Sequence, residues 1–90
     1  MLNELFAIIQ DRKANPTEKS YTAALFAEGE DRILQKVGEE AVEVILAAKG
    51  QGNQRLIEET ADLFYHMLVL LAAKGLTLAD VEAELRQRHQ

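Results

Sequence analysis

The apolar residues of this chain recur three or four positions apart, the spacing of amphipathic helices. β-branched residues are scattered rather than alternating, and the chain contains a single proline. The pattern therefore predicts an all-α fold with short breaks. Five helices are expected, at about residues 3–13, from Ser20 or Thr22 through Ala27, over 30–49, from Asn53 as the cap through Lys74, and from the capping pair Thr77 and Asp80 to about Arg88.

Glycines and the Asn15-Pro16 pair mark the breaks between these helices. Gly29, Gly52 and Gly75 follow helical segments, as expected of residues that end helices. Gly38 is different because it lies inside the third predicted helix, where glycine costs about 1 kcal/mol relative to alanine. We expect a close contact with another helix at this position.

A narrow acidic stripe lies on the helix predicted over 30–49, which is apolar around most of its circumference. The stripe consists of Lys36, Glu39, Glu40 and Glu43. On the following helix, Glu59, Asp62 and His66 share one face, and the residues after Asp62 are apolar on nearly all sides. Solvated acidic faces are usually wider and more polar, so these two faces are candidates for a functional site.

The acidic residues form two matched pairs, Glu40-x-x-Glu43 and Glu59-x-x-Asp62. Residues three apart lie within one turn on a common helix face. Fifteen residues separate the pairs, which allows two antiparallel helices to bring all four carboxylates to one point. Helix bundles build carboxylate metal sites in this way, and hard oxygen ligands suit Mg²⁺ or Mn²⁺ better than zinc. The alternative is that the four are ordinary surface carboxylates.

Composition narrows the possible functions further. Ninety residues predict a single domain spanning residues 1–90, and 48% of them are hydrophobic. The apolar surplus between Leu63 and Ala73 predicts a homodimer that completes a helical bundle. The absence of cysteine excludes disulfides and thiolate metal sites, and the net charge of −5 argues against nucleic-acid binding. With neither a signal-peptide pattern nor a sufficiently long apolar stretch, we expect a cytoplasmic protein without a membrane span.

Three segments carry a family resemblance: Ser20-Tyr-Thr22, Lys36-Val-Gly-Glu-Glu-Ala-Val-Glu43 and Glu59-Thr-Ala-Asp-Leu-Phe-Tyr-His66. In order and spacing the chain resembles the phosphoribosyl-ATP pyrophosphohydrolases of histidine biosynthesis, within the MazG-like all-α superfamily. The resemblance implies a MazG-like bundle completed by dimerisation, and Mg²⁺-dependent hydrolysis of phosphoribosyl-ATP to phosphoribosyl-AMP and pyrophosphate. It also implies the stand-alone form, without a fused cyclohydrolase domain.

The resemblance assigns roles to particular residues. It implies that the metal ligands are Glu40, Glu43, Glu59 and Asp62. Glu39, next to them, is the candidate for the water-activating base or for a further ligand. It also favours substrate contacts by Ser20, Tyr21 and Thr22, and Lys36 is a further candidate for contact with the substrate.

Several alternatives stay open at this point. Within the same chemistry, the chain could be a MazG-like enzyme that hydrolyses non-standard nucleoside triphosphates. In another class, it could be a non-catalytic helical dimerisation module. Lys36 could contact a phosphate or merely offset the carboxylates. For His66, a buried hydrogen-bonded side chain is the commoner case than a ligand or catalytic group.

Overall fold

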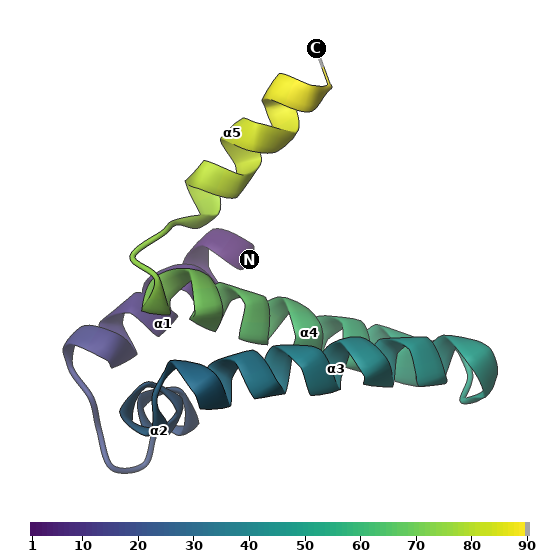
Figure 1. Cartoon of the computed structure of the whole chain (residues 1–90), viewed down its shortest axis with the longest axis horizontal. Coiled ribbons are helices and arrows are strands. Elements are labelled where there is room, and N and C mark those ends of the chain that lie inside the picture. Colours follow the sequence, from purple (N-terminus) through teal and green to yellow (C-terminus); the bar gives the residue numbers. More distant parts are fainter. Residues whose placement is uncertain (90) are drawn as a thin grey trace.

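The computed structural model describes residues 1–89, which form α-helices and no β-strand. The all-α prediction is therefore confirmed. The helices, in chain order, are α1 (Leu2–Ala14), α2 (Tyr21–Glu28), α3 (Glu30–Gly50), α4 (Asn53–Ala73) and α5 (Leu78–Arg88) (Figure 1).

Side-chain caps mark where two of these helices, α2 and α5, begin. Ser20 rather than Thr22 caps α2, because its hydroxyl accepts a hydrogen bond from the Ala23 amide at 3.1 Å. Thr77 and Asp80 form the expected capping box at the start of α5. The prediction that Asn53 caps α4 was wrong, because Gly52 precedes the helix and Asn53 is its first residue.

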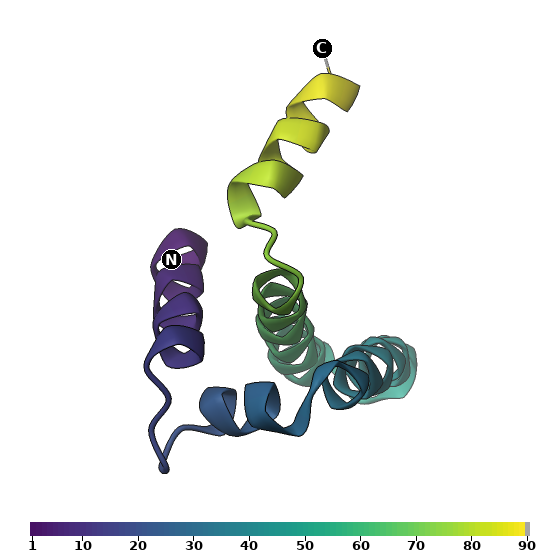
Figure 2. The same ribbon diagram turned by 60° about the vertical axis from the view of Figure 1, so that its left-hand side comes forward.

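The α3–α4 pair is the scaffold of the fold. The two longest helices run antiparallel and lie side by side, joined by a turn of two residues (Figures 1 and 2). The connection reverses sharply at Gly52, whose φ of 89° and ψ of 164° lie in a region open almost only to glycine. This short turn brings the two acidic helix faces together.

The hydrophobic core lies at one end of this pair, where α1 and α2 pack against it. Its buried residues are Phe6 and Ile9 of α1, Leu25 of α2, Ile33 of α3, and Leu68, Val69 and Ala72 of α4. Two polar contacts close the same end of the molecule. Lys13 donates to the carbonyl of Ala72 at 2.7 Å, and Lys74 pairs with Glu30 at 2.8 Å. The core thus holds the ends of α3 and α4 that lie away from their connecting turn.

Helix α5 projects away from the rest of the molecule and buries none of its residues (Figures 1 and 2). Its apolar residues Val81 and Leu85 are exposed. In the described part of the chain, no helix is by itself long and apolar enough to cross a membrane. Helices α4 and α5 pass that test only as a pair, and the chain bends by 107° between them.

The expected close contact at Gly38 is absent. Gly38 is exposed on α3, and a Cβ atom placed there would meet no atom within 4 Å. Helix α4 packs against a different face of α3, because Glu40 and Ala47 are buried whereas Gly38 is not.

Candidate metal centre

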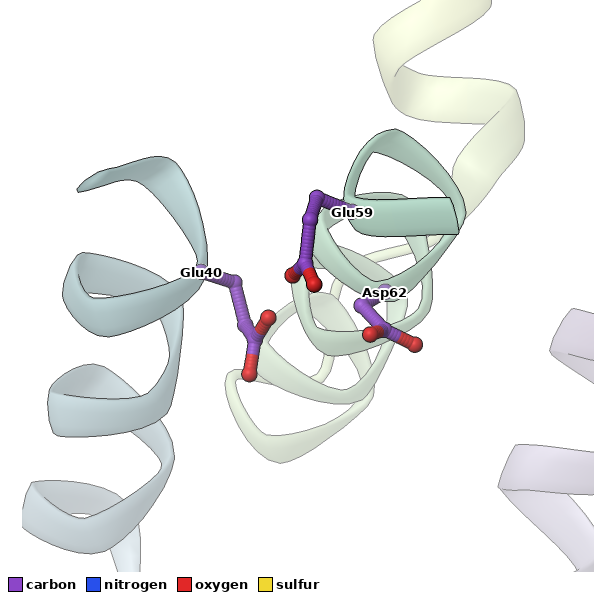
Figure 3. A group of neighbouring side chains, drawn as sticks. All are labelled: Glu40, Glu59 and Asp62. Atoms are coloured by element: carbon purple, nitrogen blue, oxygen red, sulfur yellow. The ribbon is translucent and has the colours of Figure 1, made fainter. Parts of the chain in front are cut away.

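Three carboxylates from the two central helices converge on one point. Glu40 of α3 and Glu59 and Asp62 of α4 each place an oxygen so that the three lie within 4.8 Å of one another (Figure 3). Glu40 is only 9% exposed and Glu59 only 5%, whereas Asp62 is open to solvent. The arrangement is a carboxylate cluster with a buried base and an open side.

The antiparallel course of α3 and α4 brings acids from both helices together, but not all four of the predicted ligands. Glu43 is partly buried and lies outside the three-carboxylate group. Its role as a ligand stays a prediction.

Glu39, the candidate for activating water, also lies outside the group. Its side chain is 50% exposed, and its Oε1 is 3.8 Å from Nη1 of Arg32 on the same helix. It neighbours Glu40 in the sequence but points to a more open part of the α3 surface. This position leaves Glu39 free of tight pairing.

Two cations offset the carboxylate charge. Lys36 pairs with Glu40 at 3.3 Å, which agrees with the charge-offsetting alternative for this lysine. Arg55, one turn before Glu59 on α4, pairs with both Glu59 and Glu58. Sequence reasoning did not single out Arg55, although its spacing of four residues from Glu59 is the signal for such a pair.

Burial is the main reason that the pKa of Glu59 is raised above its usual value. The Arg55 guanidinium opposes this shift, while Asp62 and Glu40 add to it. Next to it, the pKa of Glu58 is lowered, because Arg55 and then Gln54 donate hydrogen bonds to its carboxylate. The buried base of the cluster therefore holds a carboxylate whose ionised form is disfavoured without a bound cation.

The donor set fits a hard divalent cation. The converging atoms are all carboxylate oxygens, which match the preferences of Mg²⁺ and Mn²⁺. No nitrogen or sulfur ligand belongs to the group among the described residues. A cation at this point would also relieve the repulsion and desolvation that raise the pKa of Glu59.

The first turn of α2 lies against α4 next to the cluster. The hydroxyl of Tyr21 is 3.2 Å from Nε2 of His66, and Nδ1 of the same ring is 2.7 Å from the backbone oxygen of Asp62. The Thr22 hydroxyl hydrogen-bonds to Tyr65, a residue that sequence reasoning did not select. Burial, as the main cause, raises the pKa of the Tyr65 phenol. The structure thus links the predicted Ser20–Thr22 segment to the helix of Glu59 and Asp62.

Comparison with known proteins bears on this site. Residues 2–89 match the family described as phosphoribosyl-ATP pyrophosphohydrolase. A phosphoribosyl-ATP pyrophosphatase of Listeria welshimeri serovar 6b is 56% identical over 88 residues, which cover 98% of this chain and 84% of the relative. Proteins of the same name from Pelotomaculum thermopropionicum and Haloarcula marismortui are 52% and 51% identical over 90 residues, 92% of each relative.

The match covers both acidic helices and the α2 segment that lies against them. At such identity over nearly the whole length, the family of the chain is clear. This chain belongs to the phosphoribosyl-ATP pyrophosphohydrolase family.

Proposed function

We propose that this protein hydrolyses phosphoribosyl-ATP to phosphoribosyl-AMP and pyrophosphate in histidine biosynthesis, in the cytoplasm. The observation that carries the proposal is the convergence of Glu40, Glu59 and Asp62, in a chain of this family. A polyphosphate cannot approach such an acidic site without cations. We therefore infer that the active protein binds Mg²⁺, or Mn²⁺ in its place, through these three residues, with Glu43 as a further ligand.

The reaction adds water across the anhydride between the first and second phosphates of the substrate. The water oxygen bonds to the phosphorus of the first phosphate, the P–O bond from that phosphorus to the bridging oxygen breaks, and pyrophosphate leaves with the bonding electron pair. A cation bound by the carboxylates would withdraw charge from the phosphate oxygens and stabilise the leaving pyrophosphate. Glu39 takes the proton from the attacking water in this proposal, because it directly precedes Glu40 in the sequence and its exposed carboxylate does not belong to the three-carboxylate group.

Basic and hydroxyl groups around the cluster complete the proposed substrate site. Lys36 lies at the edge of the carboxylates, 3.3 Å from Glu40, where its ammonium group can turn toward a phosphate. The Ser20–Thr22 segment faces α4 beside Asp62 through the contacts of Tyr21 and Thr22. Because the Ser20 hydroxyl already accepts a hydrogen bond from the Ala23 amide, the main role of Ser20 in this proposal is to cap the start of α2.

We further propose that the active protein is a homodimer. Helices α3 and α4 carry large apolar residues that their own chain leaves exposed: Leu34, Val42, Ile45, Leu46, Ile57, Phe64 and Met67. Several lie three or four residues apart, so they form stripes along the two helices. A second copy that packs its α3–α4 pair on these stripes would complete a four-helix bundle.

The test of the activity is pyrophosphate release from phosphoribosyl-ATP with Mg²⁺. A panel of canonical and non-standard nucleoside triphosphates distinguishes the proposed reaction from general nucleotide hydrolysis. Preference for phosphoribosyl-ATP supports the proposal. Failure to release pyrophosphate from phosphoribosyl-ATP, or a clear preference for another triphosphate, contradicts it.

The division of labour among the acids needs a second experiment, a Mg²⁺ titration of pyrophosphate release. Asp62→Asn should weaken metal binding, so excess Mg²⁺ should restore part of its activity. Glu39→Gln should keep its Mg²⁺ requirement and lose about 10²–10⁴-fold in kcat, the usual contribution of a general base. Glu4→Gln, which changes an exposed carboxylate on α1, is the control and should behave as wild type. Rescue of Glu39→Gln by excess metal would make Glu39 a ligand instead.

A further inference from the structure

His66 has a single neutral tautomer that satisfies both of its hydrogen-bond contacts. The ring is 5% exposed, and its Nδ1 lies 2.7 Å from the carbonyl oxygen of Asp62. A carbonyl oxygen only accepts, so Nδ1 must carry the proton. In a neutral ring, Nε2 then has a lone pair and no proton, and it can only accept.

This tautomer fixes the direction of the hydrogen bond from Tyr21. The Tyr21 oxygen lies 3.2 Å from Nε2, so the phenol donates its proton to the ring. The Tyr21 hydroxyl has no other proton, and its remaining lone pairs can only accept. Tyr21 as a whole residue is 52% exposed, so a ligand can reach its side chain.

The contacts around the ring hold this geometry in place. The Tyr65 ring packs edge-on against His66, with centroids 4.9 Å apart and planes at 87°. The Tyr21 ring meets His66 edge-on as well, at 6.1 Å. Because Nδ1 of His66 is bonded to the backbone of Asp62, this cluster ties the Tyr21 hydroxyl to the turn that carries an acid of the metal centre.

We propose that His66 is a positioning residue that holds the Tyr21 hydroxyl as an acceptor for a sugar hydroxyl of the substrate. The inference rests on the proposed function. Phosphate oxygens are acceptors and gain nothing from a second acceptor, whereas the hydroxyl groups of a phosphoribosyl or ribose unit can donate to it. Tyr21 therefore faces a sugar rather than the polyphosphate.

Variants at position 66 distinguish the hydrogen bond made by Nδ1 of His66 from the one made by Nε2. The side-chain amide of Asn reaches about as far as Nδ1, and that of Gln about as far as Nε2. His66→Gln should therefore still accept from Tyr21 and keep KM near wild type. His66→Asn loses this link, as does Tyr21→Phe. Each should raise KM for phosphoribosyl-ATP by about two- to tenfold with little change in kcat, the effect of one hydrogen bond.

A double-mutant cycle tests whether His66 acts through Tyr21. Adding Tyr21→Phe to His66→Asn should raise KM no further, whereas adding it to His66→Gln should raise KM as it does in wild type. Thr60→Val is the control, because the Thr60 hydroxyl donates within its own helix, to the Leu56 carbonyl at 2.7 Å. Additive effects in the His66→Asn background would overturn the proposal, as would an unchanged KM in Tyr21→Phe.

Two further readouts complete the test. Inorganic pyrophosphate has no hydroxyl group to donate, so its inhibition constant in Tyr21→Phe should stay within about twofold of the wild-type value. If the inhibition constant rises as much as KM does, Tyr21 contacts the phosphates and the proposal is overturned. Nitrogen-15 NMR of the wild-type imidazole should show that the neutral ring carries its proton on Nδ1. A proton on Nε2 would overturn the proposal even if every His66 variant failed to fold. If wild type does not hydrolyse phosphoribosyl-ATP, the proposed function and this inference both fail; additivity in an active enzyme overturns the inference alone.

Discussion

Replacement of Gly38 by alanine should stabilise the protein. Gly38 lies in the interior of α3, is exposed, and has no atom within 4 Å of the place where a Cβ would stand. Glycine inside a helix costs about 0.5–1 kcal/mol relative to alanine, mainly because it has more conformational freedom to lose on folding. With no contact to oppose this gain, Gly38→Ala should raise the free energy of unfolding by about that amount.

For a domain of this size, 1 kcal/mol corresponds to about 4–8 °C in melting temperature. Gly38→Ala should therefore raise Tm by about 2–8 °C, measured by circular dichroism at 222 nm with EDTA present. Gly52→Ala is the matched comparison. A Cβ at Gly52 would also have no atom of the described residues within 4 Å. However, the φ of 89° and ψ of 164° of Gly52 would strain an alanine, at a cost of order 1–3 kcal/mol. This variant should melt at least about 4 °C lower.

The two glycine variants distinguish the steric effect of an added methyl group from the effect of backbone conformation. A lower Tm for Gly38→Ala would refute the reasoning, because it would mean that the methyl group meets an obstacle at this site. A Tm decrease that grows with protein concentration would identify that obstacle as a second copy of the chain. An unchanged Tm for Gly52→Ala would instead refute the account of the α3–α4 turn.

Three other predictions concern the metal centre and the dimer. Mg²⁺ at about 100 times its Kd should stabilise the folded protein by about 2.7 kcal/mol through mass action, which is measured as a rise in Tm. Glu40→Gln should reduce this rise. If Glu43→Gln shows the same rise as wild type, Glu43 is not a metal ligand. The pKa of Glu59 is raised in the folded protein, so its contribution to the stability of the metal-free protein is complete below the unfolded carboxyl pKa and is lost as pH rises through the folded pKa. Glu59→Gln should therefore have a higher Tm than wild type at pH 7.5, and the difference should shrink toward pH 4. An equal difference in Tm at both pH values would contradict this. Sedimentation at micromolar concentration should show a dimer, which Met67→Glu should weaken; a stable wild-type monomer would contradict the proposed bundle.

Helical periodicity and the acidic spacing were readable without any tertiary information, because they depend on residues close in sequence. The helices follow from apolar spacing and from glycine, Ser20 and Thr77 at their ends, and the structure moves most boundaries by only a few residues. The error at Asn53 was local, since both Asn and Gly suit the start of a helix and only the φ and ψ at position 52 distinguish them. The pairing of Arg55 with Glu59 was also open to sequence reasoning, through their spacing of four residues.

Which acids meet was decided by the tertiary structure. The i, i+3 spacing places Glu43 and Asp62 each on a face shared with a partner, but only the packing of α3 against α4 decides that Asp62 meets Glu40 while Glu43 stays outside the group. The open space at Gly38 likewise depends on which face of α3 meets α4.

The environment of His66 depends on packing between distant segments. A residue spaced four from Asp62 was visible in the sequence, but the contact with Tyr21, 45 residues away, was not. Hydrogen bonds between helices require a relative position and rotation that no single helix specifies. The sequence by itself thus determined the helices and the acids that each one carries, while only their packing decided which oxygens converge and how His66 is held, because those depend on distances between residues far apart in the chain.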